Sequence, residues 1–242
     1  MADKNIVDRT KAHRNADLAR TVRETRDRLS QQPGNPAFDR EMLRLHAAAL
    51  TGRAAVLPVL AGVVAAAGLV AGMGPQVAFW AVLTAVAYAG LGLFAAHIAK
   101  RDAGDIDVAS VRIVLLGAHA VTGLCWTWFA LLACESCQID QFATVKGVVL
   151  LFAVAATAIL AYALRGALLA TFGLPVVAYI GLAVNLWNPV DAAMAGLLAA
   201  SLPFFSYIAG HLHRSAVMLL SFRTEKDGLI AELETAKSIS DE

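Results

Sequence analysis

The sequence predicts an all-α fold: a polytopic six-helix transmembrane bundle with cytoplasmic N-terminal helices and a C-terminal coiled-coil helix. Three observations predict it. The 242 residues are 58% hydrophobic and only 16% charged, which is too apolar for an ordinary soluble domain. Six apolar windows are long enough to cross a bilayer. If the chain crosses the membrane at each window, nearly all Lys and Arg lie in segments on the same side of the membrane.

The first predicted domain, residues 1–53, is a cytoplasmic helical segment. It holds eleven of the twenty Lys and Arg and has no apolar stretch typical of an export signal. Residues 16–29 and 38–50 are expected to form two helices, because Pro33-Gly34-Asn35-Pro36 breaks the chain between them.

The second of these helices is amphipathic and runs almost directly into the first apolar window. Its apolar residues recur at helical spacing at Phe38, Met42, Leu45 and Ala49. We expect this helix to lie on the inner membrane surface, to pack on a partner helix, or to be a solvated helix before the membrane.

The second predicted domain, residues 54–212, is a six-span transmembrane sensor domain. A helix needs roughly 20 mainly apolar residues to cross about 30 Å of hydrocarbon, because the bilayer offers its backbone no water. The predicted spans are residues 54–73, 76–99, 113–133, 143–164, 167–187 and 192–212. Pro58, Pro175 and Pro203 are expected to kink or loosen the first, fifth and sixth spans, since each lacks a backbone N–H.

The distribution of positive charge predicts the orientation. With the N-terminus inside, nineteen of the twenty Lys and Arg lie on the cytoplasmic face, and the C-terminus is cytoplasmic as well. Lys146 is the exception, near the outer end of the fourth span, where its long side chain is expected to reach the interface.

The third predicted domain, residues 213–242, is a cytoplasmic linker helix that continues the last span. An approximate a/d register runs through it, with Lys226 at one a position. The core positions of this helix are Leu219, Phe222, Leu229, Leu233 and Ala236. Such a register favours a short coiled coil, and therefore a homodimer formed through this helix.

Candidate ligand or sensing residues lie in the spans. His119 stands out as an ionisable side chain well inside a predicted span, which favours either a functional role or a hydrogen bond to a neighbouring helix. Trp126 and Trp128 lie toward the predicted outer half, as do Trp80 and Trp187. An aromatic belt explains these tryptophans, and a quinone or other flat apolar ligand is the alternative, with Asn185 or Asn188 as its polar handle.

Cys134 and Cys137 are the redox or disulfide candidates, at the predicted outer end of the third span. A structural disulfide, two free thiols, a redox-sensing pair and a soft-metal site are all compatible with this spacing. No catalytic motif and no metal site is recognisable elsewhere, no cofactor is indicated, and none of the six histidines is followed by Glu or Asp as a kinase phosphoacceptor usually is. The lipid bilayer is an expected partner and nucleic acid is not.

Two charged segments carry a family resemblance. The stretch Phe222-Arg-Thr-Glu-Lys-Asp-Gly-Leu-Ile-Ala-Glu-Leu-Glu-Thr-Ala-Lys-Ser-Ile-Ser-Asp-Glu242 resembles the linker after the last membrane span in proteobacterial, especially alphaproteobacterial, sensor histidine kinases. Phe38-Asp-Arg-Glu-Met-Leu-Arg-Leu-His46 is similar to the helix before the first span of such proteins. Together they cover about 30 residues, and diguanylate cyclases use similar linkers.

The resemblance implies the input module of a two-component sensor histidine kinase in a bacterial inner membrane. A downstream kinase domain and a response regulator would be its partners, and the chain would be a truncated protein or a separated input module. The alternative from another class is a small transporter or permease-like protein, which predicts polar residues on a midplane path and broken helices. A scaffold or assembly subunit is the third alternative.

Overall fold

We describe a computed structural model of the chain over residues 36–53, 55–101, 107–133, 142–186 and 189–240. Two compact units divide the chain, and residues 36–217 form the larger one. Residues from 218 onward belong to the other unit, together with residues 1–35. The helix predicted over residues 16–29 lies outside the described residues.

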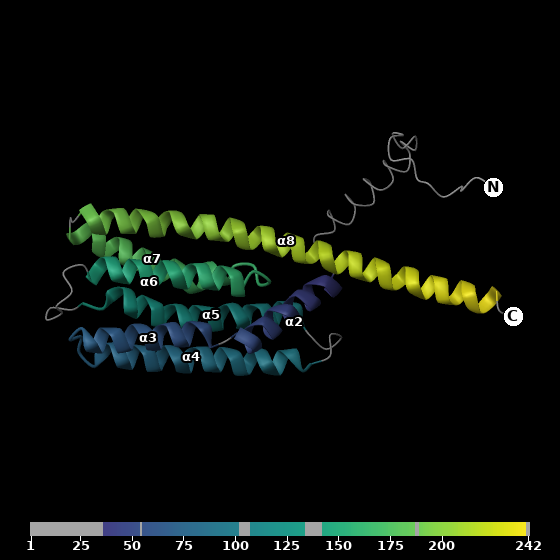
Figure 1. Cartoon of the computed structure of the whole chain (residues 1–242), viewed down its shortest axis with the longest axis horizontal. Coiled ribbons are helices and arrows are strands. Elements are labelled where there is room, and N and C mark those ends of the chain that lie inside the picture. The colour runs from purple at the N-terminus through teal and green to yellow at the C-terminus, as the bar shows by residue number, and fades with distance from the viewer. Residues whose placement is uncertain (1–35, 54, 102–106, 134–141, 187–188, 241–242) are drawn as a thin grey trace, which may run out of the picture. The chain divides into compact units, whose positions relative to one another are not determined.

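The described chain is all-α (Figure 1). Its helices are α2 (Pro36–Arg53), α3 (Val56–Val70), α4 (Gln76–Ala99), α5 (Val108–Leu131), α6 (Phe142–Leu160), α7 (Ala167–Leu186) and α8 (Pro189–Ser240). Within the described residues, six helical segments are long and apolar enough to cross a membrane, by length and composition. The prediction of six apolar helices of spanning length is therefore confirmed, and α4, α6 and α7 begin or end within a few residues of the predicted bounds.

Two tight turns make antiparallel hairpins of α3 with α4 and of α6 with α7. After α3, the amide of Ala71 donates to Ala67 and that of Met73 donates to Gly68, while Gly72 has a φ of 87°. Gly166 has a φ of 90° just before α7. Glycine has no Cβ to oppose these left-handed conformations, so the chain reverses direction within a few residues.

Helix α5 lies at the centre of the larger unit. It packs most extensively against α7 and also against α4, while α3 lies along α4 (Figure 1). The contact between α5 and α7 is close because a Cβ added to Gly123 would stand 2.5 Å from the backbone oxygen of Thr171. A residue without a side chain thus sets the distance between these two helices.

The first crossing is broken into two helices. α3 has 15 residues, a length of about 22 Å, which is too short for about 30 Å of hydrocarbon. The segment of spanning length instead runs over Phe38–Val70 and includes most of α2. Pro58 lies in the first turn of α3, where its missing N–H costs no helical hydrogen bond.

Of the three arrangements expected for α2, the structure has the packing on partner helices. It packs against α4 and α5 and crosses them obliquely (Figure 1). Its buried face consists of Met42, Leu43, His46, Ala47 and Leu50. The helical period was predicted correctly, but the buried stripe is rotated from the one that Leu45 and Ala49 defined.

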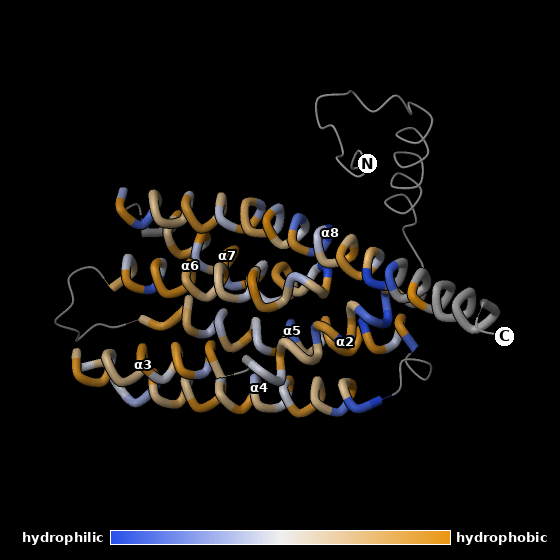
Figure 2. Tube along the Cα trace, turned by 45° about the vertical axis from the view of Figure 1, so that its right-hand side comes forward, coloured by the Kyte–Doolittle hydropathy of each residue, from blue (hydrophilic) through white to orange (hydrophobic). Residues whose placement is uncertain are grey.

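The outer surface of the helices is apolar. Large hydrophobic side chains are exposed along their length, among them Val63, Val86, Leu93, Ile113, Phe152 and Val177. Hydrophilic residues gather where α4 ends and where α2 begins (Figure 2). An apolar exterior of this kind is the surface that a lipid bilayer solvates.

Helix α5 begins with a side-chain cap outside its apolar segment. Asp107 accepts from the amide of Ala109 at 3.2 Å and from the hydroxyl of Ser110 at 2.6 Å. These bonds, first that from Ser110 and then that from Ala109, hold the pKa of the Asp107 carboxyl below its ordinary value. The cap explains why α5 begins at Val108, five residues before the predicted start of the third span.

Candidate functional site

A pair of buried histidines joins the first and third crossings. His46 of α2 is fully buried and His119 of α5 is 2% exposed. Their Nε2 atoms lie 3.2 Å apart, and the two rings are tilted by 45°. Two nitrogens at this distance form a hydrogen bond when one carries a hydrogen and the other a lone pair.

Thr171 of α7 fixes which nitrogen carries the hydrogen. Its hydroxyl donates to the carbonyl of Ala167 at 2.9 Å, and it lies 3.2 Å from Nδ1 of His119. A carbonyl only accepts, so the single hydroxyl hydrogen goes to Ala167 and Thr171 accepts from His119 Nδ1–H. His119 Nε2 then bears the lone pair, and His46 Nε2–H donates to it.

Among the described residues, this order leaves one nitrogen of the His46–His119 pair without a partner. Nδ1 of His46 is buried and, within the described residues, has no hydrogen-bond partner. With the hydrogen of His46 on Nε2, this Nδ1 is an acceptor. Leaving a buried acceptor unpaired costs roughly 1–3 kcal/mol. His46 Nδ1 is therefore an unfavourable atom in a set of otherwise complete hydrogen bonds.

A small cavity lies beside His119. Its lining includes Tyr88 of α4 and Thr157 of α6, together with apolar side chains of α2, α3 and α6. It has room for about one water molecule. The hydroxyl of Thr157 is buried and, among the described groups, has no partner, and the surface of the cavity is almost entirely apolar.

Comparison with family models, curated proteins and solved structures gave no match to this chain. Function is therefore inferred from the chain's own residues.

Trp126 packs in a buried cluster of aromatic side chains. The indole Nε1–H of Trp126 donates to the Tyr88 hydroxyl at 3.0 Å, and that of Trp80 donates to the carbonyl of Cys125 at 2.9 Å. Trp80 stacks on Phe129 at 4.4 Å, and Trp126 lies 5.7 Å from Phe172 of α7. Both tryptophans are fully buried, so an aromatic belt at the interface does not explain them.

Trp128 is different, because it is partly exposed and packs against Phe79 of α4 with ring centroids 5.4 Å apart. The structure therefore does not bring Trp126 and Trp128 together in one site. Asn185 lies in α7, but its side chain is outside the described part of the chain, as are Cys134, Cys137, Trp187 and Asn188.

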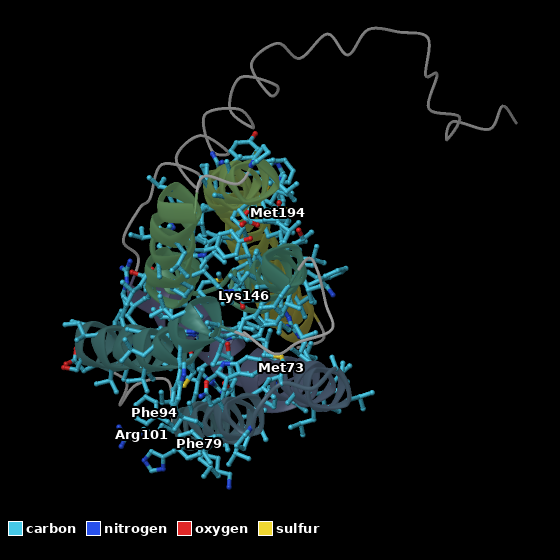
Figure 3. The ribbon with its side chains drawn as sticks, turned by 90° about the vertical axis from the view of Figure 1, so that its left-hand side faces the viewer. Met73, Phe79, Phe94, Arg101, Lys146 and Met194 are labelled. Carbon is cyan, nitrogen blue, oxygen red and sulfur yellow. The ribbon has the colours of Figure 1, made fainter. Side chains whose placement is uncertain are left out.

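Lys146 is buried at the opposite end of α5 from Asp107. Its ammonium group donates to the carbonyls of Ala130 at 3.0 Å and Leu132 at 2.8 Å, and it lies 5.2 Å from the ring centre of Phe142. Figure 3 shows the side chain inside the bundle. Lys146 does not extend to the interface as expected; it caps the C-terminus of α5, where a cation favours the helix dipole.

The predicted core of the C-terminal helix is only partly described. Leu219 and Phe222 are 70% and 52% exposed on α8. Leu229, Leu233 and Ala236 lie within α8, but their side chains fall outside the described set. No group of three or more His, Cys, Asp or Glu side chains that could hold a metal is found in the described ranges.

His46 is the site residue that the sequence reasoning missed. It was placed in a cytoplasmic helix because charged residues surround it, among them Arg40, Glu41 and Arg44. The available signal was its spacing: Met42 and Leu50 lie one turn before and after His46, on the same helical face.

Proposed function

We propose that this chain is the transmembrane input module of a two-component sensor histidine kinase in a bacterial inner membrane. In this proposal both termini are cytoplasmic. A stimulus alters the packing of the bundle, and α8 transmits the change to a kinase domain outside this chain, which acts on a response regulator.

The continuity of α8 is the observation that carries the proposal. α8 is a single helix of 52 residues, although roughly 20 are enough to cross the hydrocarbon. Its apolar segment runs over Pro189–Arg223, and the charged linker follows without a break in the helix. A continuous helix can carry a shift or rotation out of the membrane, which is a recurrent mode of switching.

The linker part of α8 has the surface that a coiled coil requires. Leu219 and Phe222 are three residues apart and largely exposed, at a and d positions of the register. Large apolar side chains that are exposed beyond a membrane span favour burial against a partner. The same helix of a second copy offers the same a and d side chains to pack against. We therefore include a parallel homodimer through α8 in the proposal.

Charge supports the orientation. Lys100, Arg101, Arg112 and Arg165 lie at or near helix ends that meet at one end of the larger unit, which we call the basic end. Hydrophilic colour gathers at this end in Figure 2. Basic residues concentrate on the cytoplasmic side of membrane proteins, so the basic end is cytoplasmic in the proposal.

Cysteine cross-linking in native membranes tests the dimer. In a background without Cys125, Cys134 and Cys137, we expect Leu219→Cys and Phe222→Cys to form intermolecular disulfides rapidly. The matched control Ser221→Cys occupies a c position, away from the seam, and should cross-link at least several-fold more slowly. Equal rates at all three positions would rule out the proposed seam.

One observation favours the transporter alternative. The first crossing is broken, and the histidine chain places polar groups between α2, α5 and α7, as in helices that bind a transported solute. The adjoining cavity has room for about one water, so a transported solute would require substantial opening of the bundle. We rank this function second for that reason.

A further inference from the structure

The unpaired Nδ1 of His46 is the starting point. The hydrogen-bond order derived from Thr171 assigns hydrogens to His119 Nδ1 and His46 Nε2 and a bonded lone pair to His119 Nε2. Of the imidazole nitrogens that the His46–His119–Thr171 hydrogen bonds leave, His46 Nδ1 carries the lone pair that meets no donor in the described residues.

We propose that His46 Nδ1 is a proton-binding site and that its protonation releases α2 from its packing against α4 and α5. This deepens the proposed function by naming the proton as a stimulus. Only the effect on a kinase rests on the proposed function; the proton site itself does not.

The added proton has a defined origin and destination. Hydronium at the basic end transfers one proton to the Nδ1 lone pair and leaves water behind. No other bond of the chain has to break, because His46 Nε2–H continues to donate to His119 Nε2. That bond becomes charge-assisted, and His119 keeps its own donation to Thr171.

The surroundings do not offer the resulting cation a counter-charge. From α4, the titratable side chain that lines the adjoining cavity is Tyr88, and from α5 it is His119 itself, which is neutral. α6 and α7 contribute the hydroxyls of Thr157 and Thr171.

The remaining elements do not supply a counter-charge either. The α3 segment has no titratable residue in its sequence. In the described part of the chain, neither histidine ring is bonded to a carboxylate.

Helix α2 can relieve this cost by moving toward water. A charged imidazole is unfavourable in an apolar interior and less so at a wet interface. The opposite face of α2 carries Arg44 and Glu41, which form a 3.8 Å ion pair with both side chains about two-fifths exposed. The same helix holds the half-buried Arg40, whose Nε has no partner in the described set.

This arrangement has the parts of a two-state element. In the packed state, His46 is neutral and bonded to His119. In the released state, His46 has a higher affinity for the proton. A proton therefore shifts the equilibrium by its differential affinity for the two states.

Nitrogen-15 NMR of the histidine-labelled chain in lipid nanodiscs tests the first part. At neutral pH we expect His46 to be the Nε2–H tautomer with a bare Nδ1, and on acidification Nδ1 should gain a proton while the His119 Nδ1–H signal persists. Finding the hydrogen of His46 on Nδ1 at neutral pH would overturn the assignment.

Hydrogen exchange of residues 42–50 tests the second part on the same preparation. We expect protection in the wild type to fall on acidification by up to about tenfold per pH unit, the limit for one linked proton. His46→Gln should abolish this fall relative to wild type at each pH, whereas the control His97→Gln, at an exposed residue beside Arg101, should retain it.

An equal fall in hydrogen-exchange protection in the wild type, His46→Gln and His97→Gln would contradict the release of α2. Should His46→Gln fail to fold, the NMR result on the wild type still decides the proton site. Both measurements use the isolated chain, so an acid-driven release without any effect on kinase output would count against the proposed function and leave the proton site standing.

Discussion

At the scale of single residues, the buried polar groups of this chain join helices that apolar packing alone would leave free to slide. In a bilayer, lipid tails solvate apolar side chains as well as another helix does, so helix association depends on close packing and on polar contacts. His46 joins α2 to α5, and Lys146 joins α6 to α5. His119 and Lys146 were recognisable in the sequence as ionisable groups within apolar windows.

The partners of these residues were not recognisable. Lys146 bonds to backbone carbonyls of Ala130 and Leu132, which carry no side-chain signature. His46 lies among charged residues of the helix, which hid the fact that its own face is apolar. Sequence periodicity gives the spacing of a buried stripe, but its rotation depends on which neighbour the helix meets.

Replacing Lys146 tests its role as a cap. Lys146→Met keeps the length of the side chain but leaves two carbonyls unpaired, and it also removes the cation that interacts electrostatically with Asp191 of α8. We expect a loss of about 2–3 kcal/mol, the range for hydrogen bonds to a charged group, measured as resistance to denaturation in detergent. The control Lys100→Met, at an exposed residue after α4, should change stability by less than about 0.5 kcal/mol. A tolerated Lys146→Met would show that the carbonyls find other partners.

At the scale of helices, hydropathy predicted the number and approximate bounds of the apolar segments, because the thickness of the bilayer sets the length of helix needed to cross it. The first crossing was the exception. Its apolar window reached back only to residue 54, while packing draws α2 into the crossing although that helix carries charge on its other face. Tertiary contacts that no local pattern encodes made this difference.

Glycine contacts between helices give a second prediction. Gly123→Ala would place a methyl group 2.5 Å from Thr171 O and 3.0 Å from Ala170 O, both backbone atoms that yield only if α5 and α7 separate. We expect a loss of about 1–3 kcal/mol from this overpacking, measured by unfolding in mixed micelles.

Gly117→Ala on the same helix is the matched control. A Cβ there meets nothing within 4 Å, so removing a flexible glycine should leave stability unchanged or raise it by up to about 1 kcal/mol. Similar losses in both variants would mean that the close approach of α5 and α7 at Gly123 does not cause the effect.

At the scale of the whole molecule, the proposal depends on α8 leaving the membrane on the same side as the start of the chain. Even crossings and the basic end both require this arrangement. A cytoplasmic linker is also what a kinase domain needs, because its phosphodonor is inside the cell. The all-α fold class could be predicted from composition, whereas the proposed proton site depends on a contact between residues 73 positions apart in sequence.

Paired topology reporters fused after Glu242 measure this directly. A fluorescent protein that matures only in the cytoplasm should be bright, and an alkaline phosphatase that needs the oxidising periplasm should be inactive. The opposite result, a dark fluorescent protein and an active phosphatase, would place α8 outside the cell and contradict its role in controlling a cytoplasmic kinase.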